Sequence, residues 1–440
     1  MAERAVAIAL FTRDLRVHDN PVLAAAVAAG TVVPLFVLDD GILGREPVAA
    51  NRLRFLLAAL ADLDAELREL GARLIVRRGS VVEEVDRVAV ETGAASVHVA
   101  ADVSHYSRRR ERELRGRAQE SGYRLVVHPA TVTVVDTGEL RPATGRDHFA
   151  VFSPYLRRWL ETPLRAPLPR PDRLRAVDIE SVELPAYSEL SSDPGSPGLT
   201  VGGETAGRKL LREWLSGPVE SYHTDNDILA GATSGLSPYL HFGCLSAAEV
   251  VRRTDLDTPG GYAFARQIAW RDFHHQMLAA RPDLARTDYR PRPTPGRRDP
   301  QAFAAWRDGR TGYPVVDAAM RQLQAEGFMP GRARLIAASF LAKSLGVDWR
   351  LGAAHFMHWL VDGDIANNQL NWQWAAGTGT DTRPNRILNP IRQADRYDPD
   401  GDYVRRWLPE LADIPGVAVH KPWRILVPDY PAPIIEFNGM

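Results

Sequence analysis

Residues 52–76 read RLRFLLAALADLDAELRELGARLIV, an amphipathic segment that runs through a glycine into a short apolar run. From Leu53 onward, leucines recur at intervals of three and four residues, which is the spacing of one helix face. Gly71 then stands where a helix C-cap is expected. The apolar run at residues 73–76 follows directly, so this stretch predicts a helix that leads into a buried strand.

The same alternation of apolar runs and helical segments extends over the first 130 residues. The apolar runs fall at residues 6–11, 32–38, 73–76, 96–99 and 124–127. Five strands that alternate with helices favour a parallel sheet covered by helices on both faces. The sequence has no G-x-G-x-x-G after the first run and no G-x-x-x-x-G-K-[ST] anywhere, so ordinary dinucleotide and P-loop chemistry are not expected.

Beyond the predicted sheet the organisation changes. Residues 161–200 contain seven prolines, which predicts an irregular linker draped over the surface. From about residue 202 the spacing is helical almost throughout, with helices expected at 204–215, 246–253, 262–280, 315–325, 332–345 and 353–360. We therefore expect an α/β plus all-α protein, divided into an α/β domain (1–130), a linker (131–200) and an all-helical domain (201–440).

Composition narrows the class of protein. No apolar run approaches the roughly 20 residues of a membrane span, and the N-terminal run reads as a strand rather than a signal peptide. The single cysteine, Cys244, excludes an intrachain disulfide and a thiolate metal cluster, which favours a reducing cytoplasm. Residues 262–350 hold 15 Lys and Arg against 8 Asp and Glu. That excess suits either a solvated basic face or a surface for a polyanion.

Two groups of residues early in the helical half suggest ligand binding. Residues 233–238 (TSGLSP) place hydroxyls and a glycine before a helical stretch, which suits a phosphate, although a helix cap with a turn explains the same pattern. Gln267, Trp270, Arg271 and His274 share one helix face. Such a stripe suits a planar, anionic or nucleobase ligand, and a half-exposed amphipathic helix is the alternative.

Two further groups follow. Residues 362–368 (DGDIANN) precede a W-Q-W stretch at 372–374. The two carboxylates lack the further acidic cluster that a calcium loop needs, and no metal site is expected. They could cap a helix, or, with the neighbouring Asn and Trp residues, bind a planar heteroaromatic ligand. Six of the ten tryptophans lie between residues 270 and 374, although core packing is the usual role of Trp.

Taken together, these segments resemble the photolyase and cryptochrome family, most closely its bacterial class I cyclobutane pyrimidine dimer photolyases. Residues 11–20 (FTRDLRVHDN) resemble the family's opening F-R-x-D-L-R-x-x-D-N. Residues 306–320, 341–350, 362–381 and 405–411 match in the same order. The resemblance covers nearly the whole chain, and it implies a Rossmann-like antenna domain before a helical domain that holds a U-shaped FAD.

The resemblance also assigns residues to the cofactor. Arg334 should pair with Asp362 beside the flavin, Asp364 should accept a hydrogen bond from the isoalloxazine edge, and Asn368 should face flavin N5. The phosphates should be held by Tyr222, Thr233, Ser234, Gly235, Leu236 and Ser237, and the remaining cofactor contacts should come from Phe264, Gln267 and Arg271.

Electron transfer and substrate binding are assigned in the same way. Trp306, Trp349 and Trp372 match the relay that carries electrons from the surface to photoexcited oxidised flavin. Trp270 and Trp374 match aromatics that pack on a flipped-out pyrimidine dimer, and the predicted substrate contacts also include Gln267, Arg332 and Leu335. The family's reaction is one-electron transfer from light-excited, reduced FAD to the dimer, after which the cyclobutane ring opens and the electron returns. The partner is UV-damaged DNA, whose lesion is extruded into the site.

Several positions depart from the family's pattern. Gln267 stands where these photolyases usually have Glu, Gly331 replaces an Asn, and Leu335 replaces a Met that touches the dimer. Pro384-Asn385-Arg386 interrupts a stretch that is usually Pro-Tyr-Phe-Arg. Gln at the first position occurs in the (6-4)-photoproduct branch, but the substrate histidines of that branch are absent from residues 330–335.

The alternatives to dimer repair are a (6-4)-photoproduct photolyase and a cryptochrome-type blue-light receptor. A second, antenna chromophore is expected in the N-terminal domain, either a deazaflavin or methenyltetrahydrofolate. Arg52 and Asp102 fall near positions that line a deazaflavin pocket in relatives. We further expect a monomeric, cytoplasmic protein without a membrane anchor.

Overall fold

The computed structural model describes residues 5–44, 49–291, 296–425 and 427–437. Five parallel strands form one sheet in the order β3-β2-β1-β4-β5. The strands are β1 (Ala5–Leu10), β2 (Gly30–Asp39), β3 (Ile75–Gly79), β4 (Ser96–Ala100) and β5 (Arg124–His128). All five predicted strands are present. β3 is shifted toward its C-terminal side, and β1 is shifted by one residue toward the N-terminus.

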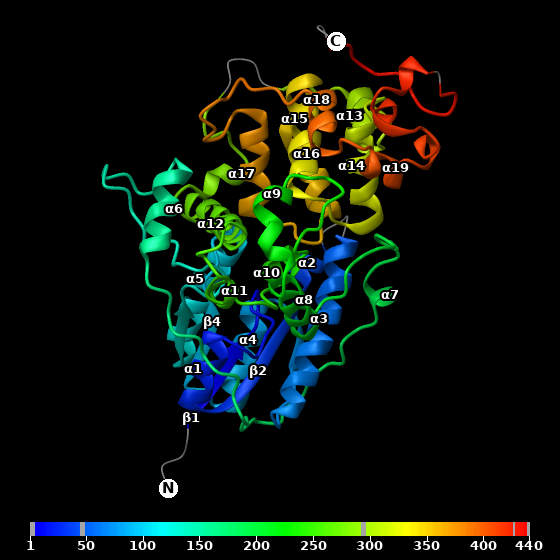
Figure 1. The fold of residues 1–440 in the computed structure, drawn as a ribbon. Helices are drawn as coiled ribbons and strands as arrows, with labels where there is room; N and C mark the ends of the chain where they lie inside the picture. The colour runs from blue at the N-terminus through cyan, green and yellow to red at the C-terminus, as the bar shows by residue number, and fades with distance from the viewer. Residues whose placement is uncertain (1–4, 45–48, 292–295, 426, 438–440) are drawn as a thin grey trace. The chain divides into compact units, whose positions relative to one another are not determined.

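Helices cover both faces of this sheet, as the alternating pattern predicts (Figure 1). They are α1 (Pro21–Ala29), α2 (Asp40–Leu43), α3 (Ala50–Glu69), α4 (Val81–Thr92) and α5 (His105–Ser121). Helices α4 and α5 bury Val85 and Leu114 against Ile8 and Leu35 of the sheet, whereas α1 packs beside β1 and β4 on the other face. Gly71, with φ +84°, follows α3 in a left-handed conformation, as a glycine near a helix end can.

The opening motif at residues 11–20 forms a buried polar network. The side chain of Asn20 accepts hydrogen bonds from Val22 N and Leu23 N, which caps α1. Arg16 is 1% exposed and donates to the carbonyl oxygens of Asp19 and Gly243. This part of the family motif therefore stabilises the fold.

The predicted linker is closely attached to the sheet edge. Val32 and Ala176 form a parallel bridge, and Val32 N donates to Arg175 O at 2.7 Å. Further along, Val182 N donates to Val76 O at 2.9 Å, beside β3. These contacts lie where β2 and β3 have no other strand as a partner, so the segment completes the hydrogen bonding of the edge.

Most of the remaining chain is helical, as expected. The helices are α6 (Phe152–Glu161), α7 (Tyr187–Leu190), α8 (Glu204–Leu215), α9 (Tyr222–Asp225), α10 (Ser237–Phe242), α11 (Ala247–Arg253), α12 (Pro259–Ala280), α13 (Pro300–Arg307), α14 (Pro314–Glu326), α15 (Gly331–Ser339), α16 (Trp349–Trp359), α17 (Ile365–Ala376), α18 (Pro390–Tyr397) and α19 (Asp402–Trp407). The helix expected at 332–345 ends at Ser339 and continues as one π-helical turn over Phe340–Ser344.

Close contacts divide the chain into two compact units. The sheet unit comprises Met1–Asp193, Val201–Glu220 and Ser234–Pro282, and the helical unit comprises Pro194–Thr200, Ser221–Thr233 and Asp283–Met440. These boundaries differ from the expected ones at residues 130 and 200, because α6, α8 and α10–α12 contact the sheet unit. The functional division at 130 and 200 stays a prediction.

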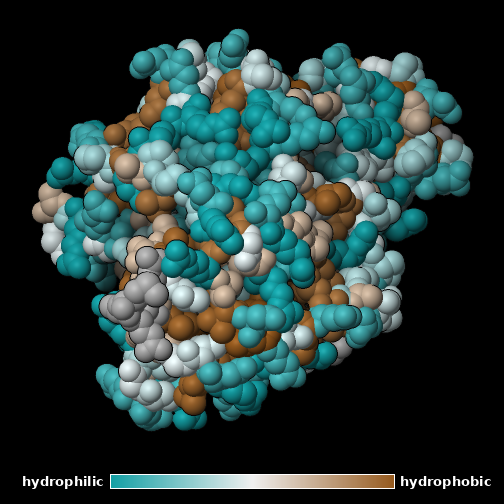
Figure 2. All heavy atoms as spheres, turned by 90° about the horizontal axis from the view of Figure 1, so that it is seen from below, coloured by the Kyte–Doolittle hydropathy of each residue, from teal (hydrophilic) through white to brown (hydrophobic). Residues whose placement is uncertain are grey.

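On the face shown in Figure 2, hydrophilic residues predominate and hydrophobic residues reach the surface in separate groups. Within the described ranges, no helix combines the length and apolar character needed to cross a membrane.

Candidate active site

In the helical unit, α17 and the loop before it gather the predicted flavin-binding polar residues. Arg334 Nη2 lies 2.8 Å from Asp362 Oδ2, which is the ion pair that the resemblance implies. Asp364 caps α17 by accepting hydrogen bonds from the backbone and side chain of Asn367. Asn368 Nδ2 donates to Ala353 O at 3.0 Å, and the residue is 8% exposed.

The three predicted relay tryptophans belong to one buried hydrophobic cluster in the helical unit. Trp372 and Trp306 meet edge-to-face with their ring centroids 5.9 Å apart. Trp306 is 0% exposed, Trp372 2% and Trp349 4%. All three side chains are therefore buried, and their role as an electron relay stays a prediction.

A glycine sets how closely α16 and α17 approach. A Cβ atom at Gly352 would lie 2.1 Å from Cη2 of Trp372, so only the missing side chain leaves room for the indole. Sequence patterns did not single out Gly352, because a single glycine inside a helical pattern gives no sign of the ring above it.

The predicted phosphate-binding residues are split between the two units. In the sheet unit, Gly235 has φ +61° and Ser234 Oγ accepts from Leu236 N at 3.4 Å, so this stretch forms a turn before α10. Ser237, the first residue of α10, is exposed, and Leu236 is buried. In the helical unit, Thr233 and Tyr222 are partly buried. Burial and the nearby carboxylate of Asp227 raise the pKa of Tyr222 to about 12, so its hydroxyl stays a donor at neutral pH.

The α12 stripe lies in the sheet unit. Gln267 is exposed and Trp270 is partly buried, with one ring face stacked on Phe152 at a centroid distance of 3.7 Å and an angle of 9°. Phe152 was missed because it falls in the stretch predicted as linker. Arg271 donates to Val132 O and Leu240 O, and these bonds orient its guanidinium toward its own unit.

Phe264 and His274, the other predicted residues of α12, are buried. Phe264 is 4% exposed and packs on Trp214, with ring centroids 5.7 Å apart. His274 is buried, so it is not available to an external ligand. Of the predicted α12 residues, Gln267 and Trp270 are therefore the most accessible.

The remaining predicted substrate contacts lie in the helical unit. Arg332 forms a two-point ion pair with Asp227, at 3.1 and 2.5 Å, and its guanidinium carbon lies 4.4 Å from the ring centroid of Tyr397. Leu335 and Trp374 are partly buried. Arg332 is thus already neutralised by a carboxylate within its own unit.

The basic excess over residues 262–350 is also partly neutralised. Arg307, Arg321 and Arg350 pair with Asp308, Glu410 and Asp288 respectively. The segment spans both units, and residues 283–350 of it lie in the helical unit.

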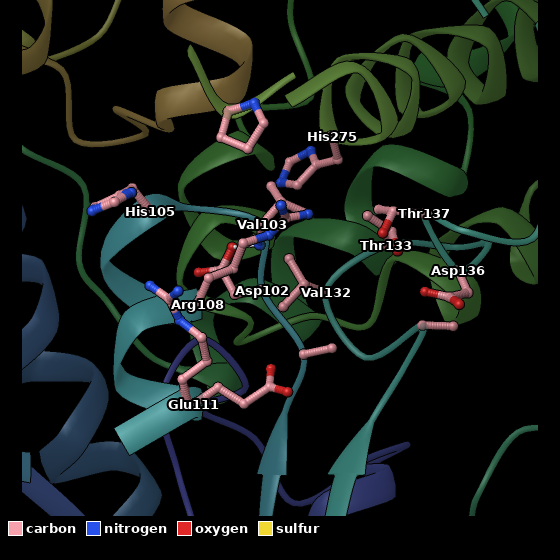
Figure 3. Close-up of a pocket in the computed structure, with 14 residues that line it drawn as sticks. Asp102, Val103, His105, Arg108, Glu111, Val132, Thr133, Asp136, Thr137 and His275 are labelled. Carbon is pink, nitrogen blue, oxygen red and sulfur yellow. Dashed lines mark hydrogen bonds between the residues drawn. The ribbon is translucent and has the colours of Figure 1, made fainter. Parts of the chain in front are cut away.

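The sheet unit contains a cavity of about 590 Å³ beyond the carboxyl ends of β4 and β5. Figure 3 shows Arg108 and Glu111 of α5 and His275 of α12 around it. Asp102 also lines the cavity, but its carboxylate already accepts hydrogen bonds from Arg13, Val103 N and Ser107. Arg52, the other predicted antenna residue, is partly buried and is not among the lining residues.

The polar residues of the helical unit suit a flavin nucleotide. A guanidinium paired to a carboxylate, a buried carboxylate at the start of α17 and a buried amide one turn later offer donors and acceptors to a flat heteroaromatic ring. Trp372 Nε1 is a buried donor with no hydrogen-bond partner among the described residues. Across those same ranges, no group of three His, Cys, Asp or Glu side chains is arranged to hold a metal ion.

Comparison with known proteins agrees with this architecture. Residues 7–172 match the family model of DNA photolyase, and residues 264–439 match that of the FAD binding domain of DNA photolyase. A deoxyribodipyrimidine photo-lyase of Streptomyces griseus is 56% identical over 98% of this chain and 96% of its own length. A cryptochrome DASH of Natronomonas pharaonis is 35% identical over 98% of both chains.

A solved bacterial class III photolyase from Agrobacterium tumefaciens superimposes with a TM-score of 0.90 at 31% identity, over 99% of this chain and 95% of that one. A parallel-sheet domain followed by a helical FAD-binding domain is the architecture of light-driven flavoproteins of this type. The chain belongs to the DNA photolyase family, which confirms the resemblance inferred from the motifs.

Proposed function

We propose that this protein is a deoxyribodipyrimidine photo-lyase that repairs cyclobutane pyrimidine dimers in DNA by light-driven electron transfer. The observation that carries the proposal is the Arg334–Asp362 ion pair beside the buried Asp364 and Asn368, next to a buried tryptophan cluster. FAD, when bound and reduced, supplies the light absorption and the transferred electron.

The chain's own residues position and protect this chemistry. Asp362 holds Arg334 in one orientation, and Asp364 and Asn368 present a carboxylate and an amide whose positions are fixed by hydrogen bonds within α16 and α17. Tyr222, Thr233 and Ser234–Ser237 are the proposed phosphate contacts, and the proposed cofactor contacts also include Phe264, Gln267 and Arg271. Trp306, Trp349 and Trp372 form the proposed relay, which recharges the cofactor and is not needed for a single repair event.

For the substrate, we assign Gln267, Trp270, Arg332, Leu335 and Trp374. The ring of Trp270, stacked on Phe152, offers a planar apolar surface for a flipped-out dimer. The damaged strand is held by phosphate contacts, and extrusion of a weakly paired lesion costs less than extrusion of intact bases.

The proposal also includes the cellular location of the protein, the roles of its domains and a place for the antenna chromophore. We expect a cytoplasmic monomer in which residues 1–130 serve as the antenna domain, 131–200 as the linker and 201–440 as the catalytic domain. The cavity lined by Arg108, Glu111 and His275 is the candidate place for a second chromophore, either a deazaflavin or methenyltetrahydrofolate.

Repair in light tests the proposal directly. Protein loaded with FAD and chemically reduced is mixed with single-stranded DNA containing cyclobutane dimers, and restored pyrimidines are measured with and without illumination. A parallel sample contains (6-4) photoproducts. We expect light-dependent repair of dimers only, because residues 330–335 lack the histidines that the (6-4) branch uses for proton transfer to its lesion. Repair of (6-4) lesions with dimers untouched would contradict the assignment.

The second candidate function is a cryptochrome-type light receptor, because a cryptochrome DASH is similar over nearly the full chain. A receptor would reduce its FAD in light and leave dimers in single-stranded DNA unrepaired, so the same experiment separates the two.

A further inference from the structure

Trp349 differs from the other two relay tryptophans in the partner of its indole nitrogen. Trp349 Nε1 donates to Asp288 Oδ1 at 2.8 Å. Trp306 Nε1 donates instead to the backbone carbonyl of Ala337, and Trp372 Nε1 has no partner within the described ranges. A carbonyl oxygen is too weak a base to take a proton, so only Trp349 has an ionisable acceptor on its indole nitrogen.

A cation lies on the ring of the same tryptophan. The guanidinium carbon of Arg350 is 4.8 Å from the ring centroid of Trp349, and Arg350 Nη2 is 2.9 Å from Asp288 Oδ1. The neutral indole is attracted to this cation through its ring electrons. An indole that has lost an electron carries a positive charge, which the nearby guanidinium would repel. The guanidinium therefore favours an uncharged oxidised ring, and the carboxylate of Asp288 lies where it can accept the proton whose loss leaves the ring uncharged.

On the basis of the relay role proposed above, we propose that Asp288 accepts the Nε1 proton of Trp349 when this tryptophan is oxidised. Trp349 loses one electron toward the photoexcited, oxidised FAD and becomes a radical cation, in which the N–H bond is far more acidic than in indole. That bond breaks, its proton binds Asp288 Oδ1, and the products are a neutral indolyl radical and a protonated carboxyl group. One electron from an external thiol reductant, with return of the same proton, restores both residues.

Proton transfer within the protein has a consequence for the lifetime of the radical. Trp349 is 4% exposed, so water has little access to take the proton. The side chain of Asp288 is 20% exposed, so the proton acceptor is more accessible to solvent than the indole that donates to it. Once the proton has moved, the electron can return only together with a proton, so charge recombination slows.

The test compares Asp288→Asn with a matched control, Asp348→Asn. The amide at position 288 keeps an acceptor for the indole N–H but is not a base. Asp348 also pairs with Arg350, at 3.1 Å, and its substitution removes the same charge without touching the indole nitrogen. FAD content and thermal unfolding are measured for every variant. Transient absorption after a light pulse then follows the radical, because the protonated and neutral tryptophan radicals have different visible spectra.

We expect wild type and Asp348→Asn to form the neutral radical, and Asp288→Asn to form it at least roughly a hundredfold more slowly, the scale of a lost proton acceptor. Asp288→Glu should restore part of the rate, and heavy water should slow the step in wild type. An unchanged neutral-radical rate in folded Asp288→Asn, or no heavy-water effect in wild type, would overturn this inference and leave the photolyase function standing. Absence of any tryptophan radical in wild type would overturn the relay itself.

Discussion

Helices α12 and α17 carry similar residues at similar spacing but differ in how deeply these residues lie. On α12, in the sheet unit, Gln267 is exposed and Trp270 is partly buried. On α17, in the helical unit, Asn368 and Trp372 are almost completely buried. A polar and aromatic stripe that is accessible suits a large ligand arriving from outside, whereas buried polar groups require a partner enclosed with them.

We propose that the two helices serve different steps. The α12 stripe is suited to recognition of the lesion, and the α17 region to holding and recharging the cofactor. Substitutions in α12 should therefore change the binding of damaged DNA, and substitutions in α17 should change the photoreduction of FAD. The opposite pattern would contradict this division of roles.

The largest effect is expected from Trp372→Phe on α17. This variant should lose most of the light-driven reduction of bound FAD, because it removes the relay member that contacts Trp306. Dimer repair by chemically reduced enzyme should persist, since repair does not use the relay. The rate of FAD reduction under illumination measures the first effect, and repair of dimer-containing DNA the second. Normal photoreduction would remove Trp372 from the relay.

Trp270→Ala on α12 should give the opposite pattern. Loss of the stacking surface should weaken binding of dimer-containing DNA by about 1–3 kcal/mol, the value of one base–aromatic stack. Photoreduction of FAD should be unchanged. Trp270→Phe, which retains a ring against Phe152, is the matched control. Normal binding of damaged DNA by the alanine variant, together with slow photoreduction of its FAD, would contradict the separate roles of α12 and α17.

Acid should destabilise the region around the buried tryptophans. His355 lies beside Trp306, with ring centroids 5.6 Å apart, and burial first, then the charges of His358 and Arg307, lower its pKa to about 4. Because the unfolded histidine binds a proton near pH 6.5, folding favours the neutral ring. The resulting stability is present above pH 6.5 and is lost as pH falls toward 4, by on the order of 2 kcal/mol at pH 5.

Denaturant unfolding at pH 7 and pH 5 measures this loss, and His355→Gln should reduce the difference between the two. In the sheet unit, His98 has its pKa lowered to about 4, mainly by burial, and serves as the comparison. Equal pH dependence in wild type and His355→Gln would show that His355 does not titrate in this range.

The smallest effect is expected from Gln267→Glu, again on α12. The amide can both donate to and accept from a thymine edge, so dimer repair should survive its replacement. Repair efficiency should change by about 1 kcal/mol, the net value of one hydrogen bond. Steady-state repair of dimer-containing DNA under constant light measures the change. A complete loss of repair would show that the amide of Gln267 is essential for recognition of the dimer and would contradict the small effect expected here.

Much of the fold could be predicted because its signals are local. Alternating apolar runs located all five strands, and α8 has the same bounds as its predicted helix, Glu204–Leu215. The π-helical turn over Phe340–Ser344 could not be predicted, because its residues continue the same apolar spacing as the helix before it. The boundaries of the two units could not be predicted either, because they depend on contacts between segments that are far apart in the sequence.

For the site, motif resemblance predicted the Arg334–Asp362 pair, which the structure confirms. Resemblance assigned Trp306 to the relay, and only the structure reveals that its side chain is fully buried. The contacts of Phe152 with Trp270 and of Asp288 with Trp349 join residues far apart in the sequence. No local pattern marks such pairs, and they emerged only from the folded chain.

The segment along the edge of the sheet also determines how the protein can be divided. Arg175–Val177 and Val182 satisfy backbone groups of β2 and β3 that would otherwise be unpaired. A fragment ending at residue 130 would present those groups as an open edge, to which another chain can add a strand. A fragment that ends at residue 130 should therefore aggregate when expressed alone, because it would lack the proline-rich segment that covers this edge.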